Sequence, residues 1–452
     1  MKRHSMDLTT GPVARQLLAF GLPLIINAAI NLLYGIVDKS MLGIYVGDAA
    51  MAAASVSNSP FNLIYNLFSG VAVGALVCCG NYLGADDRGN LRRCMHTAMS
   101  TGFLLGLVVL IVGLPLSRPV LVALGTPEEL LSDALLYFRI RFAGCPVTML
   151  NAFTVSIMNA HGDTKRITLL GIGSGLLNVV LNFVFLLVIK LGVAGVALAT
   201  LLSGLANLIC KLAIMFSPKG EYQLRVSKLL PDFKHMGRLL AVGIPNGLNS
   251  AVFSFSNVLL QSTVNSFGTA VIAGSSAADS VIAISGLAYQ GIPAATVATL
   301  SQCCGARNYD RIREVVRKAL LVCHVFVDSM CVVCLIFAQP LLGLFTQSPE
   351  VVEAGTIKLI FYCGGYFIHN FGQIYVAAIK GLRRSTAAFL VNVFSVCVPR
   401  VLWVWFVVPL VPTPAMLYLI YPISWLISAA MLGITYHSCY RKCLRSAQEQ
   451  MA

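Results

Sequence analysis

Twelve apolar segments, each long enough to cross a lipid bilayer, follow one another along the chain. A membrane-spanning helix needs about 20 consecutive apolar residues. Hydrophobic residues make up 57% of the 452 residues and charged residues only 11%, which soluble globular domains do not show. We therefore predict an all-α membrane protein with 12 transmembrane helices. They cover about residues 14–38, 49–80, 94–117, 134–158, 167–189, 193–216, 236–265, 270–302, 319–338, 355–379, 386–409 and 415–438.

The amino-terminal end shows no cleavable signal peptide, because the first apolar segment is a full span without a small-residue cleavage site. We expect this segment to remain in the mature protein. The 14 cysteines lie mostly inside apolar segments, without metal-ligand spacing toward histidines. We expect them to pack helices, and we expect no cofactor and no bound metal apart from a coupling ion.

Basic residues concentrate in every second connection between the apolar segments, and this pattern marks the cytoplasmic side. Both termini are therefore predicted to be cytoplasmic. Because these connections lie against an anionic leaflet, the net charge of +14 calls for no nucleic-acid partner. The basic residues on this side are Lys2, Arg3 and Arg15; Arg88, Arg92 and Arg93; Lys165 and Arg166; Lys211, Lys219, Arg225, Lys228, Lys234 and Arg238; Arg307, Arg311, Arg313, Arg317 and Lys318; Lys380, Arg383 and Arg384; Arg441, Lys442 and Arg445.

The chain contains an internal repeat. LLAFGLP at residues 17–23 recurs as LLAVGIP at residues 239–245, and further matches follow at nearly the same separation, such as Gly47 with Gly268 and Arg92 with Arg313. Six crossings return the second copy to the same side of the membrane. The sequence therefore predicts two six-helix bundles related by a pseudo-two-fold axis along the membrane normal. The predicted boundaries are 1–218 for the first bundle, 219–235 for a cytoplasmic linker and 236–452 for the second bundle.

Asp38 lies inside the first apolar segment, in NLLYGIVDKSMLG. A charged carboxylate is costly at membrane depth, so intramembrane acids are usually functional. Such a group can be charged or neutral. It couples two ligands if a proton and a cation compete for it, or if its protonation favours one of two helix shapes. Tyr34 lies four residues earlier on the same helix face and could hydrogen-bond Asp38. In the repeat, Leu260 takes the place of Asp38, so only the first bundle has this feature.

The chain resembles the multidrug and toxic compound extrusion (MATE) family of transporters. The resemblance is closest to the bacterial branch that includes the DNA-damage-inducible and staphylococcal multidrug members. The resemblance spans nearly the whole chain. The segments that carry it are PLIINAAINLLYGIVDKSMLG, GDAAMAAASV, NYLGADD, YFRIR, HGDTKR, GVAGVALAT, GIPNGLNS and SQCCGARN. It implies a multi-pass protein of the plasma membrane. The implied function is a secondary antiporter that exports cationic amphipathic compounds in exchange for protons or, second, sodium ions.

The resemblance also implies roles for individual residues. Pro23 marks the helix bend that accompanies proton binding, and Asn178, Asn182 and Thr200 join Asp38 in an ion-coupling site. Several members carry a second aspartate where this chain has Asn182. A sodium site here would have one carboxylate and neutral oxygen ligands, so the sequence favours protons. The seventh-helix acid of another branch is absent as well, since Phe253 takes its place.

We expect a substrate cleft with acidic, polar and aromatic residues. Asp279 is a second intramembrane acid whose repeat counterpart is Asn58, and it could contact a cationic substrate or tie two helices together. Aromatic faces attract cations, although packing is the simpler interpretation of each ring. The aromatic candidates are Phe61, Tyr65, Tyr137 and Tyr289. The roles of Asp328 and Arg400 stay open.

Two other functions are alternatives to the antiporter. A flippase or exporter of a lipid-linked metabolite from the same superfamily would carry arginines in its cleft, whereas the cleft candidates here are acids. An intramembrane enzyme would need a catalytic motif, and neither HExxH nor a nucleophile elbow is present. We therefore expect a transporter rather than an enzyme, acting as a monomer on small cationic organic substrates within the lipid bilayer.

Overall fold

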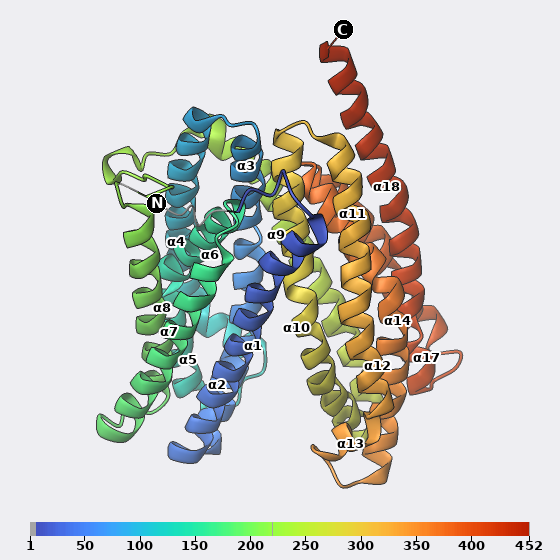
Figure 1. The fold of residues 1–452 in the computed structure, drawn as a ribbon. Coiled ribbons are helices and arrows are strands. Elements are labelled where there is room, and N and C mark those ends of the chain that lie inside the picture. Colours follow the sequence, from blue (N-terminus) through green and yellow to red (C-terminus); the bar gives the residue numbers. More distant parts are fainter. Residues whose placement is uncertain (1–5, 219, 452) are drawn as a thin grey trace. The chain divides into compact units, whose positions relative to one another are not determined.

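The computed structural model describes residues 6–218 and 220–451, and every element of regular structure in those residues is helical (Figure 1). Lys2, Arg3 and Lys219, which contribute to the predicted orientation, lie outside the described residues. The helices divide into two compact units, and each unit is described separately.

The first unit contains Ile26–Gly247 and a short amino-terminal piece that ends at Asp7. It holds most of α1 and the start of α9. Its helices are α1 (Val13–Tyr45), α2 (Asp48–Ser69), α3 (Ala72–Gly84), α4 (Arg88–Ala123), α5 (Glu128–Ala143), α6 (Cys145–Ala160), α7 (Thr164–Phe183), the π-helical η1 (Val184–Val188), α8 (Val193–Met215), the 3-10 helix η2 (Val226–Lys228) and α9 (Phe233–Val264).

The second unit contains Leu8–Ile25 and the chain from Leu248 onward. Its helices are the rest of α9, the 3-10 helix η3 (Asn265–Phe267), α10 (Thr269–Gly305), α11 (Tyr309–Cys323), α12 (Ser329–Ile336), α13 (Ala338–Gly343), α14 (Pro349–Gly381), α15 (Ser385–Asn392), α16 (Val398–Leu402), α17 (Pro414–Tyr418) and α18 (Ile420–Met451). Three π-helical segments interrupt them: η4 (His324–Asp328), η5 (Val393–Cys397) and η6 (Trp403–Val407).

Ten helices among the described residues are long and apolar enough to cross a membrane. The bent pair α5–α6, with 48° between its halves, raises the number to 11. The described stretch Thr269–Ala283 at the start of α10 is a shorter apolar helix. The all-helical membrane fold is therefore confirmed, while the predicted total of 12 spans stays a prediction.

Two helices change unit along their length, and each does so just after a proline. α1 passes from the second unit to the first between Ile25 and Ile26, shortly after Pro23. α9 passes from the first unit to the second between Gly247 and Leu248, shortly after Pro245. Proline removes one backbone hydrogen bond from a helix interior, so both crossings lie where the helix is weakened.

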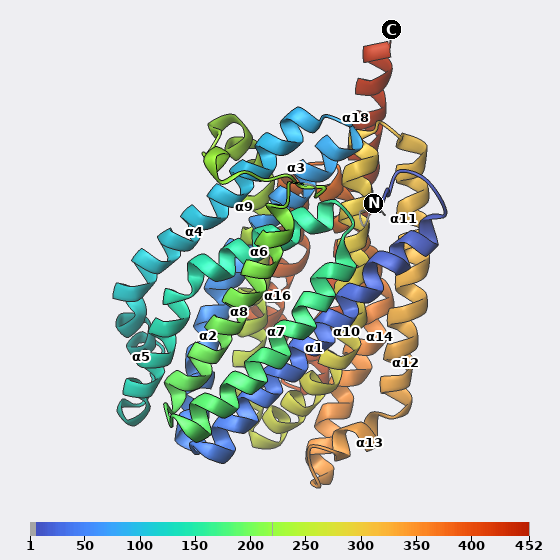
Figure 2. The ribbon, with the colours of Figure 1, turned by 60° about the vertical axis from the view of Figure 1, so that its left-hand side comes forward.

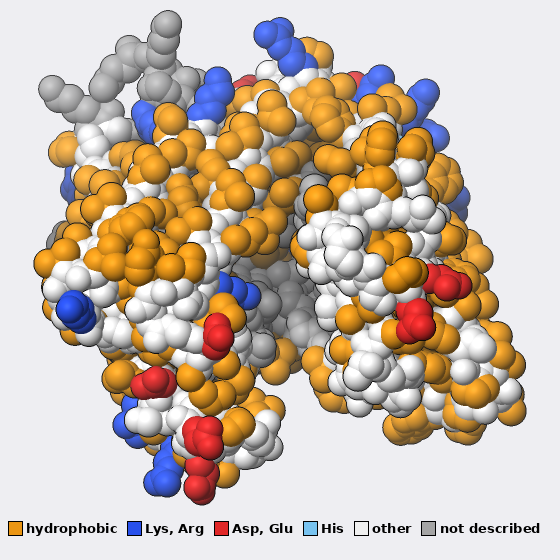
Figure 3. Space-filling view, turned by 90° about the horizontal axis from the view of Figure 1, so that it is seen from below, with side chains coloured by type: hydrophobic (Ala, Val, Ile, Leu, Met, Phe, Trp, Pro, Cys, Tyr) orange, Lys and Arg blue, Asp and Glu red, His pale blue; other side chains and the backbone are white. Residues whose placement is uncertain are grey.

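The connection between α8 and α9 packs against other connections of the first unit (Figure 2). The Tyr222 hydroxyl donates to Asp163 Oδ2 at 3.1 Å, and Arg92 donates to Gln223 at 2.6 Å. Burial raises the pKa of the Asp163 carboxyl, and Arg166 opposes this effect. The basic connections of this unit thus gather at one end of its helices. Figure 3 looks from the opposite end, where acidic side chains and several Lys and Arg side chains lie among hydrophobic ones.

Candidate functional site

Three helices of the first unit each present one polar face. A helix repeats every 3.6 residues, so positions spaced by three, four, seven, eight and eleven share a face. α7 and α8 lie side by side (Figures 1 and 2), and α1 packs against α7. The face residues are Asn27, Asn31, Tyr34, Gly35 and Asp38 on α1, Gly171, Ser174, Gly175 and Asn178 on α7, and Thr200, Ser203, Gly204, Asn207 and Lys211 on α8.

These faces enclose a cavity of about 400 Å³ that lies wholly within the first unit. Tyr65 of α2, Asn151 and Val155 of α6, and Ile167 of α7 complete its lining. Most of the lining side chains are amides or hydroxyls. Asp38 is the only carboxylate and Lys211 the only ammonium in that lining. The cavity is therefore polar, with one charge of each sign.

Asp38 is held by an amide pair on α7. Asn182 donates through Nδ2 to Asp38 Oδ1 at 2.6 Å and to Asn178 Oδ1 at 3.4 Å. The Thr200 hydroxyl and the Arg141 guanidinium also interact with the Asp38 carboxyl. The structure thus brings together four of the five predicted ion-coupling residues, namely Asp38, Asn178, Asn182 and Thr200. The sequence did not indicate that Arg141 would influence Asp38.

Tyr34 lines the same cavity but does not bond Asp38 as the sequence suggested. Its hydroxyl donates to the Ile172 carbonyl at 3.2 Å. The tyrosine ring lies where a side chain at Gly175 would be, since a Cβ there would overlap Tyr34 Cε2. Gly171 makes room in the same way for Asn27. Two glycines of the GIGSG segment therefore let α1 side chains approach the α7 backbone.

Lys211 lines the same cavity from the carboxyl-terminal part of α8. It had been counted with the cytoplasmic connections, yet it belongs to α8 and its side chain is only 3% exposed. Its Nζ donates to Asn151 Oδ1 at 3.2 Å, and Asn151 Nδ2 donates to the Gly204 carbonyl at 2.9 Å. A buried cation with a neutral partner is thus part of the site. The sequence could have indicated this, because Lys211 continues the polar face of α8.

Of the predicted cleft residues in the first unit, Tyr65 lines this cavity, whereas Asn58, Phe61 and Tyr137 are not part of its described lining. Asn58 donates to the Tyr137 hydroxyl at 3.3 Å, and Tyr137 packs in an apolar cluster with Leu42 and Val196. Phe61 is 3% exposed and lies under the Arg141 guanidinium, with 4.3 Å between that group and the ring centre.

In the second unit, Asp279 is paired within the protein. Its Oδ1 lies 2.6 Å from Lys358 Nζ, which also donates to Ser275 Oγ at 2.7 Å. The lysine side chain is 4% exposed and the aspartate side chain 53% exposed. This ion pair joins α10 to α14, which matches the helix-tying alternative stated for Asp279. Whether substrate also reaches the exposed side of Asp279 stays a prediction.

Asp328, Arg400 and Tyr289 of the second unit each contact partners that the sequence did not reveal. Asp328 accepts from Asn370 at 2.7 Å and lies 2.8 Å from His324 Nδ1. The fully buried Arg400 donates to Asn257 at 3.0 Å, and its guanidinium lies 5.4 Å from the ring centre of Phe253. Tyr289 stacks on His369, with 5.5 Å between ring centres, inside an aromatic cluster that includes Tyr366.

No group of three or more His, Cys, Asp or Glu side chains that could hold a metal ion occurs in the described part of the chain. A sodium ion at Asp38 would have to rely on neutral oxygens. Asn182 Oδ1 is such an oxygen, since it is buried without a hydrogen-bond partner.

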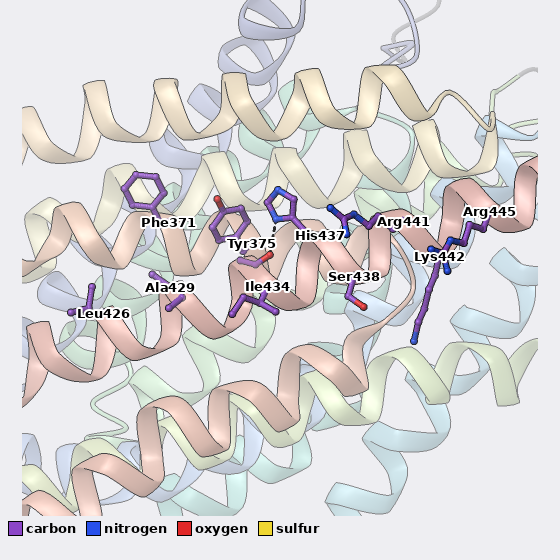
Figure 4. Close-up of a pocket in the computed structure, with 12 residues that line it drawn as sticks. Phe371, Tyr375, Leu426, Ala429, Ile434, His437, Ser438, Arg441, Lys442 and Arg445 are labelled. Atoms are coloured by element: carbon purple, nitrogen blue, oxygen red, sulfur yellow. Dashed lines mark hydrogen bonds between the residues drawn. The ribbon is translucent and has the colours of Figure 1, made fainter.

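A larger groove of about 880 Å³ lies between α14 and α18, away from these polar residues (Figure 4). Exposed apolar side chains such as Leu426 and Ile434 line one part of it, and Arg441, Lys442 and Arg445 line its end. Lipid chains cover exposed apolar side chains in a membrane. The polar cavity of the first unit is therefore the better candidate for transport.

The chain was compared with known proteins. A family model described as MatE matches residues 23–184 and 245–406, so the same model recognises each half once, as the internal repeat predicts. The chain is 23% identical over 393 residues to the probable multidrug resistance protein YoeA of Bacillus subtilis, covering 85% of this chain and 84% of that protein.

A second relative and a solved structure are also similar to this chain over most of its length. The multidrug export protein MepA of Staphylococcus aureus is 21% identical over 385 residues, which are 85% of each protein. A solved structure of a MATE protein in the straight conformation matches 98% of this chain and 99% of that chain, with a TM-score of 0.90 and 20% identity. The fold is thus that of the solved MATE proteins.

Proposed function

The chain belongs to the MATE family of multi-pass plasma-membrane transport proteins, which are not enzymes, and from this premise we propose that it is an antiporter exporting cationic amphipathic compounds in exchange for protons. The observation that carries the proposal is Asp38 in the polar cavity of the first unit, with Asn182 donating to its carboxylate. A single carboxylate among amides can hold either a proton or an organic cation. Binding of one then releases the other.

Protons are preferred to sodium as the coupling ion because of the number of charges at the site. Hard metal cations are held by several oxygen ligands, and their affinity for a site rises with the number of charged oxygens among those ligands. Here Asn182 stands beside Asp38 and supplies a neutral amide. One carboxylate suffices for a proton, whereas it makes a weak site for sodium.

The transport cycle is proposed to alternate the access of this cavity between the two sides of the membrane. In the proposed topology the protein is a monomer with 12 spans, and both of its termini are cytoplasmic, as the basic connections favour. Proton binding at Asp38 would change the preferred shape of α1, with Pro23 as the weak point. Because α1 contributes to both units, a change in its shape can act on both.

The test uses purified protein in liposomes with a fluorescent organic cation. We expect an imposed pH gradient to drive uptake and a sodium gradient alone to drive little. Asp38→Asn should lower gradient-driven uptake by about tenfold or more, since it removes the charge that proton and cation share. Asp48→Asn is the matched control, because Asp48 is an exposed acid at the start of α2.

Two results would contradict the proposal. Uptake that responds to neither gradient would exclude antiport. Gradient-driven uptake that is unchanged in Asp38→Asn would remove Asp38 from the coupling site, even if antiport itself remained.

A further inference from the structure

We propose that the cavity of the first unit recognises zwitterionic organic compounds, with Asp38 binding the cationic group and Lys211 the anionic group. This inference rests on the proposed function and specifies that the cationic group of the substrate is accompanied by an anionic group. A site that selects only cations would not place an ammonium in its own wall, because that charge repels the substrate.

The first argument is that Lys211 has no counter-charge. It is 3% exposed, and none of the ion pairs found among the described residues includes it. Its Nζ donates to the neutral Asn151 Oδ1 at 3.2 Å. A buried ammonium costs free energy unless it is paired, and a lysine that only served packing would be better replaced by an apolar residue.

The second argument is that the binding partners around Lys211 are fixed in place. Asn151 donates to the Gly204 carbonyl at 2.9 Å, which turns its Oδ1 toward the lysine. One turn before Lys211 on the same face of α8, Asn207 Oδ1 is buried without a hydrogen-bond partner. The cavity therefore offers a cation and a free acceptor, which together suit a ligand with both an anionic group and a donor.

The third argument is the distance between the two charged ends. Helical side chains point toward the helix amino terminus, so Lys211 reaches back along α8 toward Thr200, which interacts with Asp38. Its acceptor Asn151 is bonded to Gly204, only one turn, or about 6 Å, from Thr200. The two charges thus face a space of one or two helical turns, the size of a compact amine carrying a carboxylate.

The test compares two dyes that differ in one group: a rhodamine with a free carboxyl group, which is zwitterionic, and the methyl ester of the same dye, which is a cation. We expect the wild-type protein in liposomes to transport the free acid in preference to the ester. Lys211→Met should lower transport of the acid about tenfold or more, because a charge-assisted hydrogen bond is lost, and should not lower transport of the ester.

Two variants serve as controls. Lys211→Arg keeps the positive charge and should keep the preference for the acid. Lys165→Met removes an exposed lysine at the start of α7 and should change neither dye. Equal transport of both dyes by the wild type would overturn the inference, and so would a ratio of acid to ester that Lys211→Met leaves unchanged.

Binding measured in detergent, by the polarisation of the dye fluorescence, separates this inference from the proposed antiport. If neither dye responds to any gradient, antiport fails, yet weaker binding of the acid alone by Lys211→Met still supports the zwitterion site. A melting temperature close to that of the wild type shows that the variant is folded. If Lys211→Met binds both dyes as the wild type does, the inference is wrong whatever drives transport.

Discussion

Close contacts between single side chains and glycines give the cavity its shape. Gly175 and Gly173 lie in the same GIGSG segment of α7, but only Gly175 faces the ring of Tyr34. A Cβ at Gly175 would overlap Tyr34 Cε2, whereas a Cβ at Gly173 would meet nothing within 4 Å. The two positions thus form a matched pair for testing whether α1 depends on a glycine of α7.

We predict that Gly175→Ala destabilises the protein by about 1–3 kcal/mol, since the added methyl group forces the Tyr34 ring out of its place. Gly173→Ala should be neutral or stabilising by up to about 1 kcal/mol, because alanine favours a helix more than glycine does. Thermal unfolding of both variants in detergent measures the difference. Equal melting temperatures for the two variants would show that α1 and α7 can separate locally without cost.

Some site residues could be predicted from the sequence and others could not, because only some of them are unusual for their place in the chain. Asp38 stands out because a charge in an apolar segment is rare, and the spacing of Asn178 and Asn182 places them on one face. Lys211 was missed because a lysine near the end of an apolar segment looks like part of the next connection. Arg400 shows a second limit, since its contacts with Asn257 and Phe253 join α16 to α9, two helices far apart in sequence.

Among the elements, α10 and α14 are joined by the ion pair of Asp279 and Lys358. We predict that Asp279→Asn and Lys358→Met each lower stability, by about 1–2 kcal/mol once the exposure of the aspartate is taken into account. Asp279→Asn leaves a buried ammonium unpaired, so the double variant should lose less than the two single variants together. Melting temperatures of the four proteins measure this coupling.

The same four proteins separate a helix tie from a substrate contact. If Asp279 only joins the two helices, the stable double variant should transport dye at a rate within about twofold of the wild type, as expected for a change that removes no substrate contact. A double variant that is folded but inactive would instead place Asp279 in contact with substrate.

The helices themselves were predicted well from apolar length, but their interruptions were not. The predicted segment 134–158 is the bent pair α5–α6, and the bend lies at Gly144, where the sequence offers only a glycine followed by Cys145 and Pro146. The π-helical segment η1 begins two residues after Asn182. Such segments depend on packing against neighbouring helices and leave no mark in the hydropathy of the chain.

For the whole molecule, the repeat in the sequence and the compact units in the structure are different divisions. The repeat places residues 1–218 in one half and 236–452 in the other, whereas each compact unit also includes a short segment of the other half. Hydropathy indicates which segments can span the membrane, and internal similarity indicates that the two halves share an ancestor. Neither of them reports which helices pack together, because that depends on contacts between residues far apart in the chain.

The helix α9 carries the last prediction, because it passes from one unit to the other just after Pro245. Alanine at this position would restore the missing backbone hydrogen bond. It would stiffen α9 close to the residues at which the helix passes from one unit to the other. We predict that Pro245→Ala slows gradient-driven transport several-fold, by about 1 kcal/mol in the barrier, while dye binding and the melting temperature stay unchanged or increase. Stopped-flow uptake and equilibrium binding measure the two effects separately.

Pro115→Ala is the matched control, since Pro115 lies inside α4, a helix that stays within the first unit. This variant should transport as fast as the wild type. If both proline variants are slowed equally, the effect belongs to helix stiffness in general and not to the crossing. If Pro245→Ala transports at the wild-type rate, α9 does not need to bend during the cycle, and the conformational change must rely on α1 alone.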